Sequence, residues 1–143
     1  MSLGNTFEND LMKLIFNGTA ITSIADNAAS SPFTQYYISL HTADPGEAGD
    51  QTTSEAAYTS YARVAVNRNS GGWTVSGASA TNAATISFPA CTGSSSTVSY
   101  FAIGTASSGT GKILLSGALS ASLAISTGIT PQFAAGALTV TAD

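Results

Sequence analysis

The 143-residue chain carries four basic and eight acidic residues, a net charge of −4. This excludes a nucleic-acid groove, because neutralising phosphates needs clustered Lys and Arg. Its 43% hydrophobic residues exclude a disordered chain, and its length predicts one domain, residues 1–143.

Small residues dominate the composition, since Ala, Ser, Thr and Gly supply 78 of the 143 positions. Hydroxyls rather than charges must therefore keep the surface hydrated. Weak charge repulsion also lets copies of the chain pack side by side, which suits a protein held in a large assembly. It equally suits a secreted β-protein, so composition alone leaves both open.

A short helix is predicted within residues 1–18. Asn5 can cap it, with Glu8 completing a capping box, and Gly18 can end it in the left-handed conformation. The helix either packs on its own domain or docks on a neighbouring subunit through its apolar stripe. At helical spacing this stripe contains Phe7, Leu11, Leu14 and Ile15, of which Phe7, Leu11 and Leu14 are the candidate partner contacts.

From residue 36 onward, β-branched and aromatic residues occur in short runs separated by Gly, Pro, Asn and Ser. About eight such runs indicate a mainly β fold, a single-domain β-sandwich or jelly roll with the short N-terminal helix. The predicted strands are 36–41, 61–66, 73–76, 85–88, 98–103, 113–119, 122–125 and 138–141.

A long acidic loop, residues 43–58, separates the first two predicted strands. Loops longer than about twelve residues tend to be functional or disordered, so this one is either a partner-contact loop or a solvated loop. Its spacing of acids does not match a calcium-binding loop, and we predict no metal site. The candidate contact residues are Asp44, Pro45, Gly46, Glu47, Asp50 and Glu55.

The sequence contains few residues that could act as a nucleophile, a general acid or a general base. His41 is the sole histidine and alternates along a strand, which predicts a half-exposed structural residue at the mouth of the loop. A triad of His41, Asp44 and a serine would lack the nucleophile elbow that accompanies such sites. Residues 108–112 end like a phosphate-binding loop, but Ala106 stands where the motif needs Gly and Ile113 where it needs Ser or Thr. We therefore expect a hairpin turn there, no catalytic residues, no cofactor and no enzyme.

Neither a secretion signal nor a membrane span is predicted. The N-terminus carries acids ahead of its apolar residues and lacks a basic segment, and the most apolar stretch, residues 114–129, is interrupted by Ser, Thr and Gly. The single cysteine, Cys91, can form no internal disulfide and is expected to be a buried apolar residue.

Several aromatic residues could either pack in the core or form a platform for a glycan. Packing is the commoner fate of such side chains. A carbohydrate-binding β-module, using Tyr37, Tyr58 or Trp73, is the alternative from another class. The aromatic residues concerned are Tyr36, Tyr37, Tyr58, Tyr61 and Trp73.

Four segments carry a resemblance to a known family. They read LHTADPG at 40–46, YARVAV at 61–66 with GW at 72–73, and YFAIGTASSGTGKILLSG at 100–117, together with the opening NTFENDLMKLIFNGTAI. In these the chain resembles a family of small tailed-bacteriophage virion proteins that are described as tail-fibre-like. The resemblance implies a structural role in the virion and provides no active-site residues.

Two locations in the particle are consistent with this resemblance. A single compact domain without fibre repeats or a receptor-tip segment favours a capsid cement or decoration protein that stabilises the head lattice. The alternative is a tail tube or tail-fibre-associated subunit. The expected partners are the phage major capsid protein or other virion subunits, and closed symmetry suggests a homo-oligomer. Binding would use strand edges, the helix and the acidic loop, with many weak contacts adding up through avidity.

Overall fold

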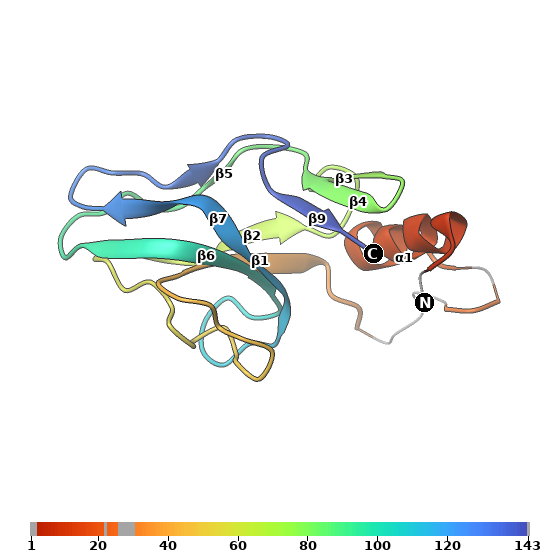
Figure 1. The fold of residues 1–143 in the computed structure, drawn as a ribbon, viewed down its shortest axis with the longest axis horizontal. Helices are drawn as coiled ribbons and strands as arrows, with labels where there is room; N and C mark the ends of the chain where they lie inside the picture. Colours follow the sequence, from red (N-terminus) through yellow and green to blue (C-terminus); the bar gives the residue numbers. More distant parts are fainter. Residues whose placement is uncertain (1–2, 22, 26–30, 143) are drawn as a thin grey trace. The chain divides into compact units, whose positions relative to one another are not determined.

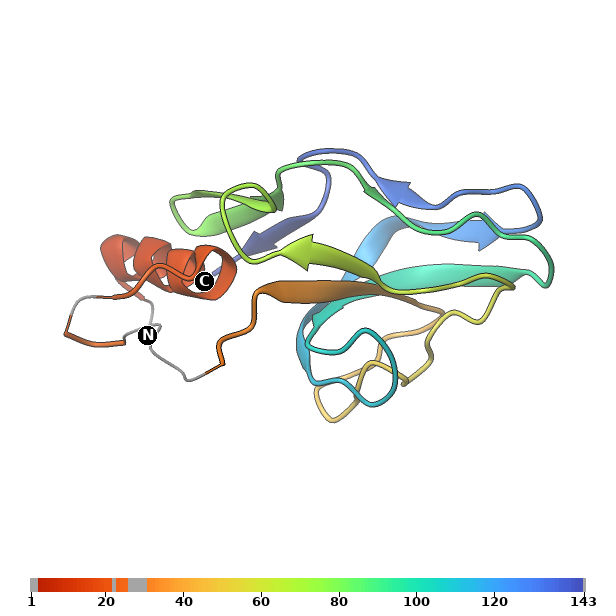
Figure 2. The same ribbon diagram turned by 180° about the vertical axis from the view of Figure 1, so that it is seen from behind.

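The computed structural model describes residues 3–21, 23–25 and 31–142 (Figures 1 and 2). The fold is mainly β with one helix, as predicted, and its antiparallel sheets are consistent with a β-sandwich. Within these residues no helix has the length and apolar character to span a membrane. The elements are α1 (Asn5–Asn17), β1 (Gln35–His41), β2 (Val64–Asn67), β3 (Trp73–Ser76), β4 (Ser79–Asn82), β5 (Ile86–Ser87), β6 (Ser96–Gly104), β7 (Ile113–Ile125), β8 (Gln132–Phe133) and β9 (Thr139–Thr141).

The chain forms two compact units, each built from segments that are separate in the sequence. The helical unit comprises the described residues of 1–34, 67–86 and 133–143, and the sheet unit comprises 35–66 and 87–132. The chain therefore passes between the units several times. The expectation of one domain over residues 1–143 stays a prediction.

Helix α1 provides one side of the core of the helical unit. Its buried residues are Met12 and Phe16, and the Phe16 ring lies 4.7 Å from the ring of Trp73 at an angle of 53°. The predicted stop is confirmed, because Gly18 takes the left-handed conformation with φ 65° and its N–H bonds to the carbonyl of Lys13. The predicted capping box is wrong: the N-cap is Gly4, and no side chain caps the helix.

The helix packs on a three-stranded antiparallel sheet in the order β3-β4-β9. Asn82, at the end of β4, is buried and ties three segments of this unit together. Its side-chain amide donates to the carbonyls of Ala84 and Ala134 at 2.8 Å, and its oxygen accepts from the N–H of Leu138 at 2.9 Å. Strand β4 was missed in the sequence because its residues, SATN, include only one β-branched residue.

The sheet unit contains a four-stranded sheet in the order β2-β1-β6-β7. Strand β1 pairs antiparallel with β6, and β6 pairs antiparallel with β7. Both faces of β1 are covered, because Ile38 and Leu40 on one face and Ser39 and His41 on the other are all buried. The predicted half exposure of His41 is therefore wrong.

The predicted strands occur with some differences in their bounds, and two observed strands, β4 and β8, were not predicted. The runs 113–119 and 122–125 join into one strand, β7, and the second strand begins at Val64 rather than at residue 61. A register shift in the β6–β7 pairing falls between Val98 and Tyr100, so the partner residues jump from Leu123 to Ala118. This irregularity marks the break that the sequence pattern placed between two strands. The short strand β8, which pairs with β5, was also missed.

Candidate functional site

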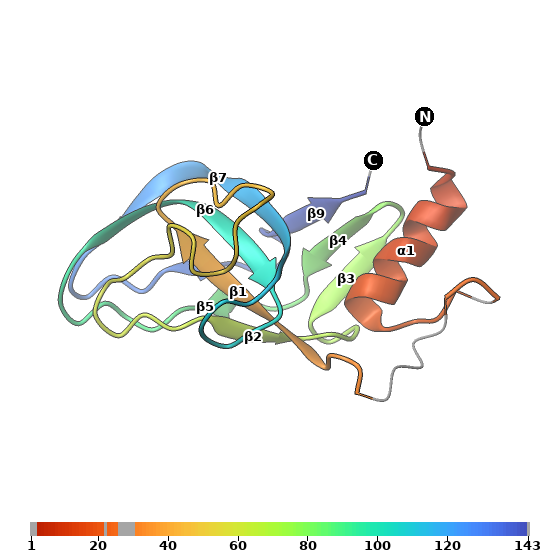
Figure 3. The ribbon, with the colours of Figure 1, turned by 90° about the horizontal axis from the view of Figure 1, so that it is seen from below.

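The acidic loop between β1 and β2 is closed at its base like a hairpin. The N–H of Thr42 donates to the carbonyl of Ser54 at 2.7 Å, and the N–H of Ala56 donates to the carbonyl of Leu40 at 2.8 Å. Residues 42–55 lie beside the turn 105–112 at one end of the four-stranded sheet (Figures 1 and 3). We call these two segments together the loop platform.

A buried glutamine joins the two segments of the loop platform. The side-chain oxygen of Gln51 accepts from the N–H of Ala106 at 3.0 Å, and its amide nitrogen donates to the carbonyl of Tyr37 at 3.3 Å. Gly104 and Gly111 make room for it, because a Cβ on either would lie within about 2.1 Å of the Gln51 side chain. The acidic loop is therefore anchored through Gln51 rather than merely solvated.

A second brace is the ion pair between Arg63 and Glu55. The Nε and Nη2 groups of Arg63 donate to the two carboxylate oxygens of Glu55 at 2.7 and 2.8 Å, a bidentate arrangement. The Arg63 guanidinium also donates to the carbonyls of Ala106 at 3.0 Å and Gly109 at 2.8 Å. The hydrogen bonds to Glu55 raise the pKa of Arg63. One cation, directly before β2, therefore links the acidic loop and the turn 105–112.

Tyr61 extends this network toward β1. Its hydroxyl donates to Glu55 at 2.9 Å and accepts from the backbone N–H of Leu40 at 3.1 Å, and burial raises its pKa. The ring packs edge-on against Tyr58 and stacks on Phe88. Tyr61 therefore acts as a packing and positioning residue.

His41 and Ser39 form a buried pair on β1. The Ser39 hydroxyl lies 2.9 Å from Nε2 of His41, and Nδ1 lies 2.8 Å from the carbonyl of Thr53. Since a carbonyl only accepts, Nδ1 carries the proton and Nε2 accepts from Ser39 in the neutral ring. Burial lowers the pKa of His41. This pair lies in the core, where it fastens the end of the acidic loop to β1.

We expect the protein to lose stability as the pH falls below about 6.5, the pKa of an unperturbed histidine. The pKa of His41 is lower in the folded chain than in the unfolded chain, so the unfolded chain binds more protons in this pH range. The free energy of unfolding therefore decreases as the pH falls. The loss of stability is absent at pH values well above 6.5, and it grows as the pH falls toward the pKa of His41 in the folded chain.

Urea denaturation followed by circular dichroism at several pH values between 5 and 8 tests this expectation. Replacing the histidine, His41→Gln, should flatten the pH dependence in this window, whereas carboxylate titration at lower pH should remain. If the free energy of unfolding changes equally with pH in both proteins, the pH dependence does not come from His41.

The four clustered acids do not converge on one point. Asp44 accepts from the N–H of Gly46 at 2.9 Å, and Asp50 accepts from the N–H and hydroxyl of Thr52 at 2.7 and 2.6 Å. The bonds from Thr52 lower the pKa of Asp50. Glu55 is held by Arg63. Among the described residues, no group of three or more His, Cys, Asp or Glu side chains could hold a metal ion.

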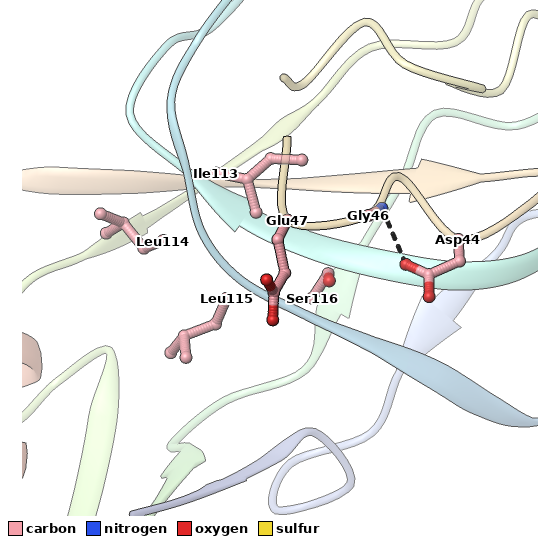
Figure 4. Close-up of a pocket in the computed structure, with 7 residues that line it drawn as sticks. All are labelled: Asp44, Gly46, Glu47, Ile113, Leu114, Leu115 and Ser116. Carbon is pink, nitrogen blue, oxygen red and sulfur yellow. Dashed lines mark hydrogen bonds between the residues drawn. The ribbon is translucent and has the colours of Figure 1, made fainter. Parts of the chain in front are cut away.

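A pocket of about 450 Å³ lies between the acidic loop and the start of β7. The loop supplies Asp44, Gly46 and Glu47, and β7 supplies residues 113–116 (Figure 4). Three of the predicted contact residues therefore share one concave surface with the beginning of β7. Of the other three, Pro45 is buried, Asp50 caps a turn and Glu55 belongs to the ion pair.

The candidate contact residues of the helix lie partly outside the core. Phe7 is exposed, whereas Leu11 and Leu14 are half-buried. The fully buried face is centred on Met12 and Phe16, one position away from the predicted stripe. The helix therefore packs on its own unit, and a second role for Phe7, Leu11 and Leu14 stays a prediction.

Two residues proposed for a glycan platform are unavailable in this structure. Tyr58 and Trp73 are buried, and Tyr37 is half-buried on β1. Tyr58 donates its hydroxyl proton to the carbonyl of Pro89 at 2.9 Å. Cys91 is buried, as predicted. Tyr58, Trp73 and Cys91 therefore form core rather than a binding face.

Arg63 and Gln51 are the residues of the platform that the sequence did not single out. Arg63 alternates with Ala62 and Val64 in the predicted strand 61–66, which assigns it to the less apolar face and gives it no particular role. Its isolation offered a signal, because it is one of only four basic residues and follows the chain's main cluster of acids. Gln51 offered no comparable signal.

The sequence was compared with models of known protein families and with curated proteins. A family model described as "Podophage GP4 fiber I protein gp80" matches residues 2–141 of the chain. No curated protein matches the sequence. The match covers almost the whole chain and both compact units.

Proposed function

Because the chain belongs to the family of the podophage GP4 fiber I protein gp80, we propose that it is a structural subunit of a fibre on the phage particle. Membership confirms the predicted tailed-phage virion family and places the protein in the virion. The observation that supports a fibre location is the family match over residues 2–141. In this role the protein works through contacts with other virion components and carries out no chemical reaction.

The architecture supports a role in contacts. The loop platform is held by the Arg63–Glu55 ion pair and by Gln51, so its outer residues are presented on a fixed base. A preorganised surface loses less conformational entropy when a partner binds. The buried position of the Ser39–His41 pair also supports a structural rather than a catalytic use of these groups.

Immunogold labelling of intact particles tests the location. We expect antibodies raised against the purified chain to mark the fibres of the virion. Labelling restricted to the head lattice would contradict the fibre proposal and support the capsid cement role that the sequence favoured. Labelling along the tail alone would support the tail tube alternative. Particles from a phage that lacks the gene provide the control for specificity.

A further inference from the structure

Strand β7 leaves a backbone edge free. It ends the order β2-β1-β6-β7, and no strand in the described part of the chain pairs with its outer side. Edges of this kind are usually guarded by Lys, Pro or bulges. Residues 113–142 contain no charged side chain, and β7 contains no Pro. The register with β6 is regular from Leu115 to Ala118 and shifts just before it, where Leu114 is an extra residue between Ile113 and Leu115, so the edge carries a bulge at its start.

The pocket borders this free edge. It is lined by four consecutive β7 residues, 113–116, and by residues of the acidic loop. No residue of β6 lines it, although β6 is the strand that pairs with β7. The opposite edge is occupied by β6, which leaves the outer edge. Leu114, which is 36% exposed, offers an apolar contact there.

Two carboxylates line the same pocket. Figure 4 shows the Glu47 side chain extending toward Leu115 and Ser116, with Asp44 farther along the loop. Among the described residues, neither Asp44 nor Glu47 forms an ion pair, whereas Glu55 pairs with Arg63. The surface therefore combines unpaired backbone groups, an apolar side chain and uncompensated negative charge.

We propose that this edge binds an extended segment of a different virion subunit, which adds as a strand along residues 113–116 and places a Lys or Arg beside Asp44 and Glu47. Backbone hydrogen bonds supply affinity in strand addition, and the side-chain pockets supply selectivity. The identity of the partner as a virion subunit rests on the proposed function, whereas the chemistry of the segment rests on the pocket.

A second copy of the chain fits this surface less well. Arg63 is in its ion pair, and Arg68 donates to carbonyls of α1, which leaves Lys13 and Lys112. Lys13 lies on a helix, which cannot add as a strand, and Lys112 directly precedes the pocket's own β7 residues.

Binding of short peptides to the purified chain tests the proposal. The probes are the capped peptide TVTRVTVT and the same peptide with Glu in place of Arg. We expect backbone amide shifts in NMR spectra at residues 113–116 and 44–47, and a dissociation constant at least tenfold lower for the Arg peptide. The variant Asp44→Asn plus Glu47→Gln should remove this preference. Its matched control, Glu8→Gln plus Asp10→Asn, makes the same change of charge on α1 and should keep it.

Three outcomes would overturn the proposal: equal binding of the two peptides, shifts confined to other residues, or self-association of the chain through residues 113–116 without peptide. The circular dichroism spectrum of each variant shows whether it has kept the fold. Because these measurements use the isolated chain, they can fail while immunogold still marks the fibres. They can also succeed where immunogold marks another part of the particle.

Discussion

Replacing Arg63 with Ala is expected to lower the free energy of unfolding by about 3 kcal/mol, the low end of the range for breaking a buried ion pair. The Arg63 side chain is 2% exposed and that of Glu55 is 17% exposed. In the variant, the Glu55 carboxylate therefore loses its ion-pair partner and is only partly hydrated by solvent. The carbonyls of Ala106 and Gly109 lose their donors in the same substitution. Urea denaturation followed by circular dichroism measures the effect.

Lys112→Ala is the matched control for Arg63→Ala. It removes one positive charge from an exposed residue at the end of the same turn and should change the free energy of unfolding by less than about 0.5 kcal/mol. The second arm of a double-mutant cycle, Glu55→Ala, should show that most of the Arg63 effect disappears once the carboxylate is gone. Additive losses would show that the pair does not brace the platform.

Replacing Trp73 with Ala should destabilise the helical unit by about 3–5 kcal/mol, the range for removing a large aromatic residue from a core. Trp73 is fully buried, and its ring packs on that of Phe16. Its indole N–H has no hydrogen-bond partner, so the loss reports packing rather than a broken hydrogen bond. Circular dichroism during urea denaturation is the suitable measurement, because Trp73 is the sole tryptophan and the variant lacks its fluorescence.

Two further substitutions separate packing from general sensitivity to mutation. Trp73→Phe keeps an aromatic ring against Phe16 and removes the unsatisfied donor, so we expect a smaller loss than for Trp73→Ala. Phe33→Ala removes a ring that is 56% exposed in the same unit and should cost less than about 0.5 kcal/mol. Equal losses at Phe33 and Trp73 would contradict the described core.

Local patterns in the sequence were sufficient for most of the elements. The helix was predictable because its apolar residues follow the helical period and Gly18 ends it, and strand 73–76 was predicted with its observed bounds. Strands β4 and β8 were not predictable, since short strands of small or polar residues form only when a neighbouring strand supplies hydrogen bonds. The sequence placed the acidic segment between two strands, but it could not distinguish the residues that are anchored from those that line the pocket, and the contact role stays a prediction.

His41 shows why burial could not be predicted from alternation. Alternation assigns it to the face opposite Ile38 and Leu40, and whether that face meets solvent depends on what folds over it. The acidic loop returns across this end of the sheet, so the carbonyl of Thr53 reaches the imidazole. Arg63 is covered in the same way, by the turn that contains Ala106 and Gly109.

By itself the sequence determined the β-rich class, the short N-terminal helix, the absence of a recognisable catalytic motif and the likeness to phage virion proteins, because composition, periodicity and motifs are local properties. Only the tertiary structure decided that Gln51 and Arg63 anchor the loop platform and that Asp44 and Glu47 share a pocket with the free edge of β7. These residues lie up to about seventy positions apart, and their proximity follows from pairing of distant strands. No local pattern encodes such a pairing.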